Sequence, residues 1–350
     1  MSQQPGLDSN IANPRPATHS PDSAAQVAER NRLLEARIEQ VQGILRAALE
    51  ARHAIDFDAL KRSAPFLVPE PDLPRYLEYP PEPHENDPRY RPAPSAPAFS
   101  EQQKRGAYEQ FVREYTAWAE GVRKIESENE RRYEASVAAV RQWHSACRQH
   151  HQEEETANAA VEQQQQDYLA RIPAAVADYC RAVLHAATFP ADLPRVFELR
   201  YHAASRSVLV DHVLPQPSDL PRVNGVKVVK SRSEYAEVAL SETALHRLHA
   251  DLVYQVCLRT VHELFDADAA GAVDTVIFNG WLEGRPGTVA GSKTCVITLS
   301  AGKEEFQALN LWDTDPKAAF KILKGIAPSK PHALMPVDPA TLPGEPGEPL

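Results

Sequence analysis

The stretch from Gln255 to Trp281, QVCLRTVHELFDADAAGAVDTVIFNGW, decides the fold of this chain. Its first half carries apolar residues at helical spacing, and its second half, from Val273 onward, has the composition of a buried strand. A domain in which helices pack on a sheet accommodates both patterns within one short stretch. The stretch contains no nucleophile motif, phosphate-binding loop or array of metal ligands, so it indicates architecture and not chemistry.

The residues around this stretch extend the same pattern, and we expect an α+β domain over residues 172–330, with antiparallel strands and packed helices. A helix is predicted to open it at Pro173, and a long helix is predicted to begin at the N-cap Ser241. The predicted strands are 196–201, 207–213, 225–230, 273–282 and 294–300, and a closing helix is predicted from Asp315 to Gly325.

The chain on the N-terminal side of this domain alternates between helical and proline-rich segments. Residues 1–21 are polar and are expected to be disordered. Residues 22–55 predict an amphipathic helix, and residues 56–99 a proline-rich linker, since eleven prolines lie between Pro65 and Pro97. The linker is interpreted as a stiff spacer, with a proline-rich ligand as the alternative. Residues 331–350 are expected to form a disordered tail.

Residues 100–171 predict one long helix that begins with a capping box at Ser100 and Gln103. Apolar residues at alternating spacings of three and four predict a coiled coil. Its expected seam consists of Tyr108, Phe111, Tyr115, Trp118, Val122 and Ile125. The pattern permits an intramolecular hairpin or self-association, and the sequence does not choose between them.

Composition narrows the classes of protein. With 38 Lys and Arg against 48 Asp and Glu, the net charge of −10 disfavours a protein that coats nucleic acid. No run of about 18 apolar residues predicts a membrane span. Four widely spaced cysteines predict neither a disulfide framework nor a zinc finger, and reduced thiols favour a cytoplasmic protein. No cofactor and no metal site are expected.

Candidate catalytic groups are few. His262, Glu263 and Asp274 are the residues that a divergent enzyme would use, although HExxH spacing is absent. A nuclease hairpin would carry an acidic residue on one strand and an acidic-x-Lys triplet on the next, and residues 298–300 lack that triplet. The acidic and histidine-rich run 150–155 is interpreted as a solvated helix face, because consecutive residues splay around a helix.

Basic residues form two groups that together predict an anion-binding or DNA-binding patch, with ordinary solvated lysines as the alternative. One group is expected on a single face of the closing helix, and the other surrounds the third strand. The residues are Lys317, Lys321 and Lys324 in the first group, and Arg222, Lys227, Lys230 and Arg232 in the second.

Several short segments lie between residues 174 and 326, among them YCRAVL at 179–184, FELRY at 197–201, VVKSR at 228–232, FNG at 278–280 and DPKA at 315–318. Taken together, these segments resemble the accessory region of bacterial Mrr-type restriction endonuclease proteins. In those proteins a helical half precedes this region and a nuclease domain follows it, and this chain stops where that domain would begin. The resemblance implies a non-catalytic accessory or targeting component in DNA restriction or anti-phage defence, assembled through the coiled coil, with a protein partner or DNA. The alternative is a divergent DNA-cleaving enzyme.

Overall fold

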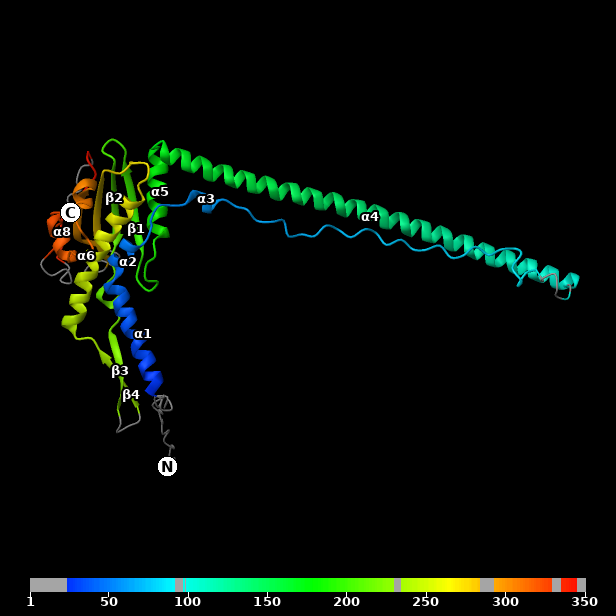
Figure 1. Ribbon diagram of the computed structural model, residues 1–350, viewed down its shortest axis with the longest axis horizontal. Coiled ribbons are helices and arrows are strands. Elements are labelled where there is room, and N and C mark those ends of the chain that lie inside the picture. Colours follow the sequence, from blue (N-terminus) through cyan, green and yellow to red (C-terminus); the bar gives the residue numbers. More distant parts are fainter. Residues whose placement is uncertain are drawn as a thin grey trace, which may run out of the picture. The chain divides into compact units, whose positions relative to one another are not determined.

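The computed structural model describes residues 24–91, 97, 99–229, 234–283, 293–328 and 335–344 (Figure 1). They belong to two compact units. The α+β unit comprises residues 1–57 and 163–350, and the helical unit comprises residues 58–162. The expectations for residues 1–21, for Lys230 and Arg232, and for residues 345–350 lie outside the described residues.

The α+β unit is built on a four-stranded sheet in the order β1-β2-β5-β6. The strands are β1 (Val196–His202), β2 (Ser207–Val213), β5 (Thr275–Glu283) and β6 (Lys293–Gly302). The pairs β1–β2 and β5–β6 are antiparallel, as predicted, but β2 and β5 are parallel. The sheet is therefore mixed, and the expectation of antiparallel strands holds for two of its three strand pairs. The physical reason is the connection, since the long crossover between β2 and β5 contains a helix that brings the chain back in the same direction.

That crossover also contains a second sheet, formed by β3 (Val223–Val229) and β4 (Glu234–Ala239). The sequence predicted β3 but not β4. The small sheet packs against α1 (Ala24–Gln42), where the side chain of Asn31 bonds both the N–H and the C=O of Val226, at 2.6 and 3.2 Å. The predicted single helix over residues 22–55 is wrong, because Gly43 separates α1 from α2 (Ile44–Glu50).

Two helices cover one face of the four-stranded sheet. They are α5 (Pro173–Ala186) and α6 (Glu242–Ala267), whose N-cap Ser241 accepts a hydrogen bond from Ala244 N–H as predicted. Their apolar stripes bury the side chains that β2 and β5 direct toward them, including Phe278, which is fully buried. Gly280 permits this packing, since a Cβ there would come within 2.4 Å of Ile297 and 2.6 Å of Leu214.

The C-terminal part of the α+β unit departs from expectation in three places. The closing helix α8 (Pro316–Ile322) ends before Lys324, which has a positive φ of 60° outside the helix. Residues 335–344, expected to belong to a disordered tail, form a strap on the other face of the sheet. The strap is held because Leu342, only 5% exposed, packs on Leu209 and Ile277. The short helix α7 (Lys303–Gln307), which follows β6, was not predicted.

The helical unit consists of an extended segment, residues 58–91, that runs along the helix α4 (Glu101–Leu169) (Figure 1). The first residues of this segment belong to the short helix α3 (Phe57–Leu60), and the predicted capping box of Ser100 and Gln103 is present at the start of α4. From Arg62 to Pro80 an extended chain spans about 56 Å. The 40 helical steps from Asn158 back to Trp118 span about 60 Å. These two lengths match, so a fully extended segment follows the helix without slack.

Polar side chains of α4 hold this extended segment by its backbone. Asn158 bonds both the N–H and the C=O of Arg62, and Asn129 bonds both groups of Leu77. The indoles of two tryptophans donate to backbone carbonyls, Trp143 to Val68 and Trp118 to Pro80. Proline carbonyls remain good acceptors although proline has no N–H, so side-chain donors suit a proline-rich strand. The linker is therefore docked on the helix and is not a free spacer.

Candidate functional site

Polar side chains line up on the sheet face that carries the strap. Asp211, Asn279 and Thr298 lie directly opposite one another on β2, β5 and β6. The amide of Asn279 donates to Asp211 Oδ1 at 3.0 Å and accepts from the Thr298 hydroxyl at 2.8 Å. Trp281 Nε1 also donates to Asp211 Oδ1, at 2.8 Å. Strand alternation places this row on the face opposite the apolar core.

The row binds the backbone of the strap. Asn279 donates to the carbonyl of Ala340 at 2.9 Å and accepts from its N–H at 3.0 Å, and Thr298 Oγ1 accepts from the same N–H at 3.3 Å. Farther along, Val337 N–H donates to the carbonyl of Cys295 at 2.9 Å. This face therefore recognises an extended peptide through one asparagine amide, as Asn31 does with Val226.

Beside the strap lies a cavity of about 210 Å³. Two carboxylates line it from neighbouring strands, since Glu198 on β1 and Asp211 on β2 are cross-strand partners. Lys293 on β6 and the indole of Trp281 complete its polar wall. Arg200 lies 3.8 Å from Asp211 Oδ2. With Arg200 counted, two acidic and two basic side chains meet here, so the set suits a ligand that carries both charges.

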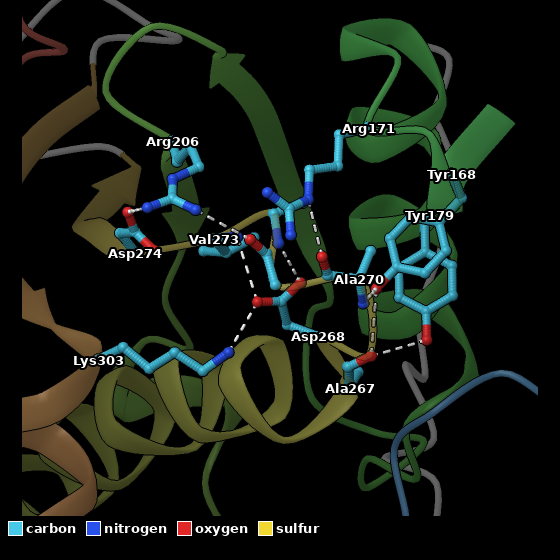
Figure 2. A network of polar contacts seen from close by, with 12 residues as sticks. Tyr168, Arg171, Tyr179, Arg206, Ala267, Asp268, Ala270, Val273, Asp274 and Lys303 are labelled. Atoms are coloured by element: carbon cyan, nitrogen blue, oxygen red, sulfur yellow. Dashed lines mark hydrogen bonds and ion pairs between the residues drawn. The ribbon is translucent and has the colours of Figure 1, made fainter.

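A second polar network surrounds the loop between α6 and β5 (Figure 2). Asp268 is at its centre, with a side chain only 1% exposed that accepts from Lys303 Nζ at 2.7 Å and from the N–H groups of Ala272 and Val273. Around it, Arg206 pairs with Asp274, and Arg171 donates to the carbonyl of Ala270. These groups satisfy one another, so the network fixes the loop and leaves no group aimed at a ligand.

Tyrosines of α4 and α5 complete the anchoring of this loop. The hydroxyls of Tyr168 and Tyr179 donate to the carbonyl of Ala267, and the two rings stack with centroids 3.7 Å apart. Burial is the main cause that raises the pKa of both hydroxyls, so they stay protonated donors.

The three residues of the alternative catalytic set each have other partners. Glu263 is buried and ion-paired with Arg259, which also donates to the Thr188 carbonyl. Burial raises the pKa of Glu263, and Arg259 opposes that shift. Asp274 pairs with Arg206, and the ring of His262 packs against that of His53 at 5.6 Å. Burial lowers the pKa of His262. Glu263 and His262 line two separate cavities, and Asp274 lines neither of them.

Among the described residues, the two predicted basic groups do not adjoin. Lys317 and Lys321 lie on α8, which packs on α6, and Lys317 sits 5.9 Å above the ring of Tyr254. Arg222 and Lys227 are exposed at the β3–β4 sheet, which lies apart from α8 in Figure 1. Lys324 leaves the shared face because the helix ends at Ile322. Two small basic groups remain.

The predicted seam is divided between two environments. Phe111 contacts the ring of Tyr90 at 5.3 Å, and Trp118 bonds the Pro80 carbonyl, so the extended segment covers that edge. Val122 and Ile125 are half-buried, whereas Tyr108 and Tyr115 are 67% and 40% exposed. Among the residues described in the helical unit no second long helix packs on α4, and a coiled coil is not confirmed.

Sequence reasoning missed the row of Asp211, Asn279 and Thr298. Its signal was present as polar residues within strands of otherwise apolar composition, at 211 in SVLVDHV and at 279 in TVIFNGW. Strand pairing was needed to align them.

Comparison with protein families, with curated proteins and with solved structures finds no match to this chain. Across the helices of the described ranges, none is both long and apolar enough to cross a membrane.

Proposed function

We propose that this chain is a non-catalytic interaction and assembly protein, and that the helical unit is its docking element. One observation carries this proposal. Among its described residues, Tyr90 and Ala107 are the only buried apolar ones. In contrast, the unit exposes many large apolar side chains, namely Leu60, Leu67, Val68, Leu73, Tyr76, Leu77, Tyr79, Tyr108, Val112, Tyr115 and Tyr133. Exposed apolar groups gathered in this way mark a surface that a partner covers.

The outer stripe of α4, which we define as Tyr108, Val112, Tyr115 and Tyr133, is the part of this surface suited to self-association. Tyr108 and Tyr115 are seven residues apart, and Tyr133 follows eighteen residues later, which is five helical turns. These side chains therefore share one face. The extended segment covers the neighbouring face, so a second copy of α4 has room to pack on the outer stripe.

Light scattering over a range of protein concentrations tests this proposal. We expect a mass above that of the monomer, and a return to monomer mass when Tyr108, Tyr115 and Tyr133 are all changed to Ser. Val238→Ser is the matched control, because that side chain is also exposed but belongs to β4. A monomer at every concentration, for the unchanged chain, would contradict self-association.

The biological setting that we propose is a bacterial DNA restriction or anti-phage defence system, in which the chain is an accessory or targeting component. The sequence resemblance over residues 174–326 supports this setting. We also propose a cytoplasmic location, supported by four cysteines that are all free thiols.

DNA binding through Lys317 and Lys321 is part of the proposal. In a titration with duplex DNA, the affinity should fall as the salt concentration rises, and it should be lower in the Lys317→Ala/Lys321→Ala variant. An unchanged affinity in that variant would contradict DNA binding through these lysines.

A divergent DNA-cleaving enzyme is the second candidate function, and the cavity beside the strap favours it. Glu198 and Asp211 face each other across β1 and β2, with Lys293 in the same wall. Paired carboxylates can hold Mg²⁺ while a lysine offsets charge on a phosphate. An acidic-x-Lys triplet that began at Asp211 would place its lysine at position 213. That residue is Val213, so this part of a nuclease motif is missing at Asp211.

Incubation of purified protein with supercoiled plasmid and Mg²⁺ or Mn²⁺ distinguishes the two functions. Intact plasmid is the result expected for an interaction protein. Cleavage that Asp211→Asn abolishes and Asp274→Asn preserves would establish the enzyme instead. Asp274 is the suitable control because its carboxylate pairs with Arg206 outside the cavity. Glu263→Ala is unsuitable, because it would leave Arg259 buried without its carboxylate partner and destabilise the fold.

A further inference from the structure

Three potential metal ligands converge on α4 within the helical unit. One ligand atom each from His150, His151 and Glu154 lies within 4.8 Å of the other two. His150 and Glu154 are separated by four residues, and His151 and Glu154 by three, so both pairs are neighbours on the helix surface. The expectation that residues of the run 150–155 splay apart is therefore wrong for these three. Long side chains that start within about one turn of helix reach a common point.

The surroundings of His150 supply a second, independent observation. Its Nδ1 atom is buried and has no hydrogen-bond partner. The ring of Phe66, from the extended segment, packs edge-on against His150 with centroids 5.5 Å apart, and shields this imidazole from water. A buried nitrogen without a partner is uncommon in folded proteins and calls for an unseen water or ion. A cation held by the His150 imidazole together with His151 and Glu154 is one candidate for such an ion.

We propose that His150, His151 and Glu154 bind a divalent transition-metal ion of the Zn²⁺ type. Two imidazoles and one carboxylate favour Zn²⁺, Co²⁺, Ni²⁺ or Cu²⁺ over Mg²⁺ and Ca²⁺, which prefer sites made entirely of oxygen ligands. Three protein ligands leave a further coordination position to water. His151 is exposed and Glu154 half-buried, so a metal ion reaches the site directly from solvent.

The site lies between two of the contacts that hold the extended segment. Asn158 bonds the backbone of Arg62 on one side of it, and Trp143 bonds that of Val68 on the other. Phe66 lies between these anchor points and packs on both His150 and Trp143. A metal that fixes the imidazole of His150 therefore also fixes the surface on which Phe66 rests. Metal binding should slow amide exchange in residues 62–68.

Titration of the full-length, chelator-stripped protein with Co²⁺ tests the proposal. We expect one equivalent to bind with a visible d–d absorption spectrum, and Zn²⁺ to displace it. The double variant His151→Ala/Glu154→Gln should weaken binding at least about tenfold, since it removes two of three ligands. The matched control is His144→Gln/Glu155→Gln, which alters the same residue types at exposed positions of α4 outside the cluster.

Two further measurements keep the result interpretable. Circular dichroism should show unchanged helicity in both double variants, and the single variant Glu154→Gln serves if the first double variant loses helix. Hydrogen exchange with and without Zn²⁺ should show slower exchange over residues 62–68 in the unchanged chain only. Absence of saturable one-to-one binding, or equal binding by the His151→Ala/Glu154→Gln variant, would overturn the proposal.

Discussion

The α+β unit and the helical unit are held together by different interactions. In the α+β unit a continuous apolar core joins α5, α6 and one face of the sheet. In the helical unit two apolar side chains are buried among its described residues, and hydrogen bonds from asparagine and tryptophan side chains hold the extended segment on α4. One chain therefore combines a unit that is stabilised by burial of apolar side chains with a unit that is stabilised by side-chain hydrogen bonds to the backbone.

The two modes of assembly meet in the strap. Residues 335–344 are fixed both by Leu342, which is buried on Leu209 and Ile277, and by the amide of Asn279, which bonds Ala340. The Asn31–Val226 contact repeats this arrangement inside the α+β unit. An asparagine amide carries an NH₂ group that donates and an oxygen that accepts in one plane, and so it can pair with both backbone groups of one residue.

The largest effect is expected for a core substitution that destabilises one unit and leaves the other unchanged. Phe278→Ala should lower the free energy of unfolding of the α+β unit by about 3–5 kcal/mol, because it opens a cavity where a fully buried ring packs. Hydrogen exchange read by mass spectrometry should show faster exchange in β2, β5 and α6 and unchanged exchange in residues 101–162. Equal acceleration in both units would show that they unfold as one.

A pH dependence between pH 6.5 and 4 should appear in the α+β unit. Burial lowers the pKa of His212 from 6.5 to about 4. Between these values the unfolded chain takes up a proton that the folded ring does not, so the free energy of unfolding should fall by about 3 kcal/mol as pH drops from 6.5 to 4. Denaturant titrations at several pH values measure it. His212→Gln should flatten the slope, and an identical slope in that variant would assign the effect elsewhere.

A smaller effect is expected at the strap. Leu342→Ala should weaken its local attachment by about 2 kcal/mol, through lost burial on Leu209 and Ile277. Exchange of the Val337 and Ala340 amides should accelerate while that of β5 stays slow. Met335→Ala is the control, since Met335 is 58% exposed. Matching acceleration in the control would mean that the strap is held by its backbone contacts alone.

The smallest effect should appear in the helical unit. Asn129→Ala and Asn158→Ala should each lower the free energy that holds the extended segment on α4 by about 1 kcal/mol. This is the net contribution of hydrogen bonds at an exposed site. The amides of Leu77 and Arg62 should exchange faster, each in its own variant. Gln152→Ala, at an exposed position of α4, should leave both unchanged. Complete release of residues 58–91 by either variant would mean that the contacts act cooperatively.

The helices and strands that depend on neighbouring residues alone could be predicted from the sequence. Helical spacing and caps predicted α5, α6 and most of α4, including the N-cap at Ser241 and the capping box at Ser100. Strand composition predicted β1, β2, β5 and β6. Proline content predicted an extended conformation for residues 65–91, because the ring fixes φ and removes donors.

Only the tertiary structure decided what these elements pack against. The parallel pairing of β2 with β5, the row of Asp211, Asn279 and Thr298, and the docking of the proline-rich segment in place of a second helix all join residues far apart in the chain. The apolar stripe of α4 was predicted, whereas the sequence left its partner open between an intramolecular hairpin and a second copy of the chain. The spacing of apolar residues indicates that one face of α4 is suited to packing. Which segment packs there depends on the length and the hydrogen-bonding groups of segments far away in the sequence.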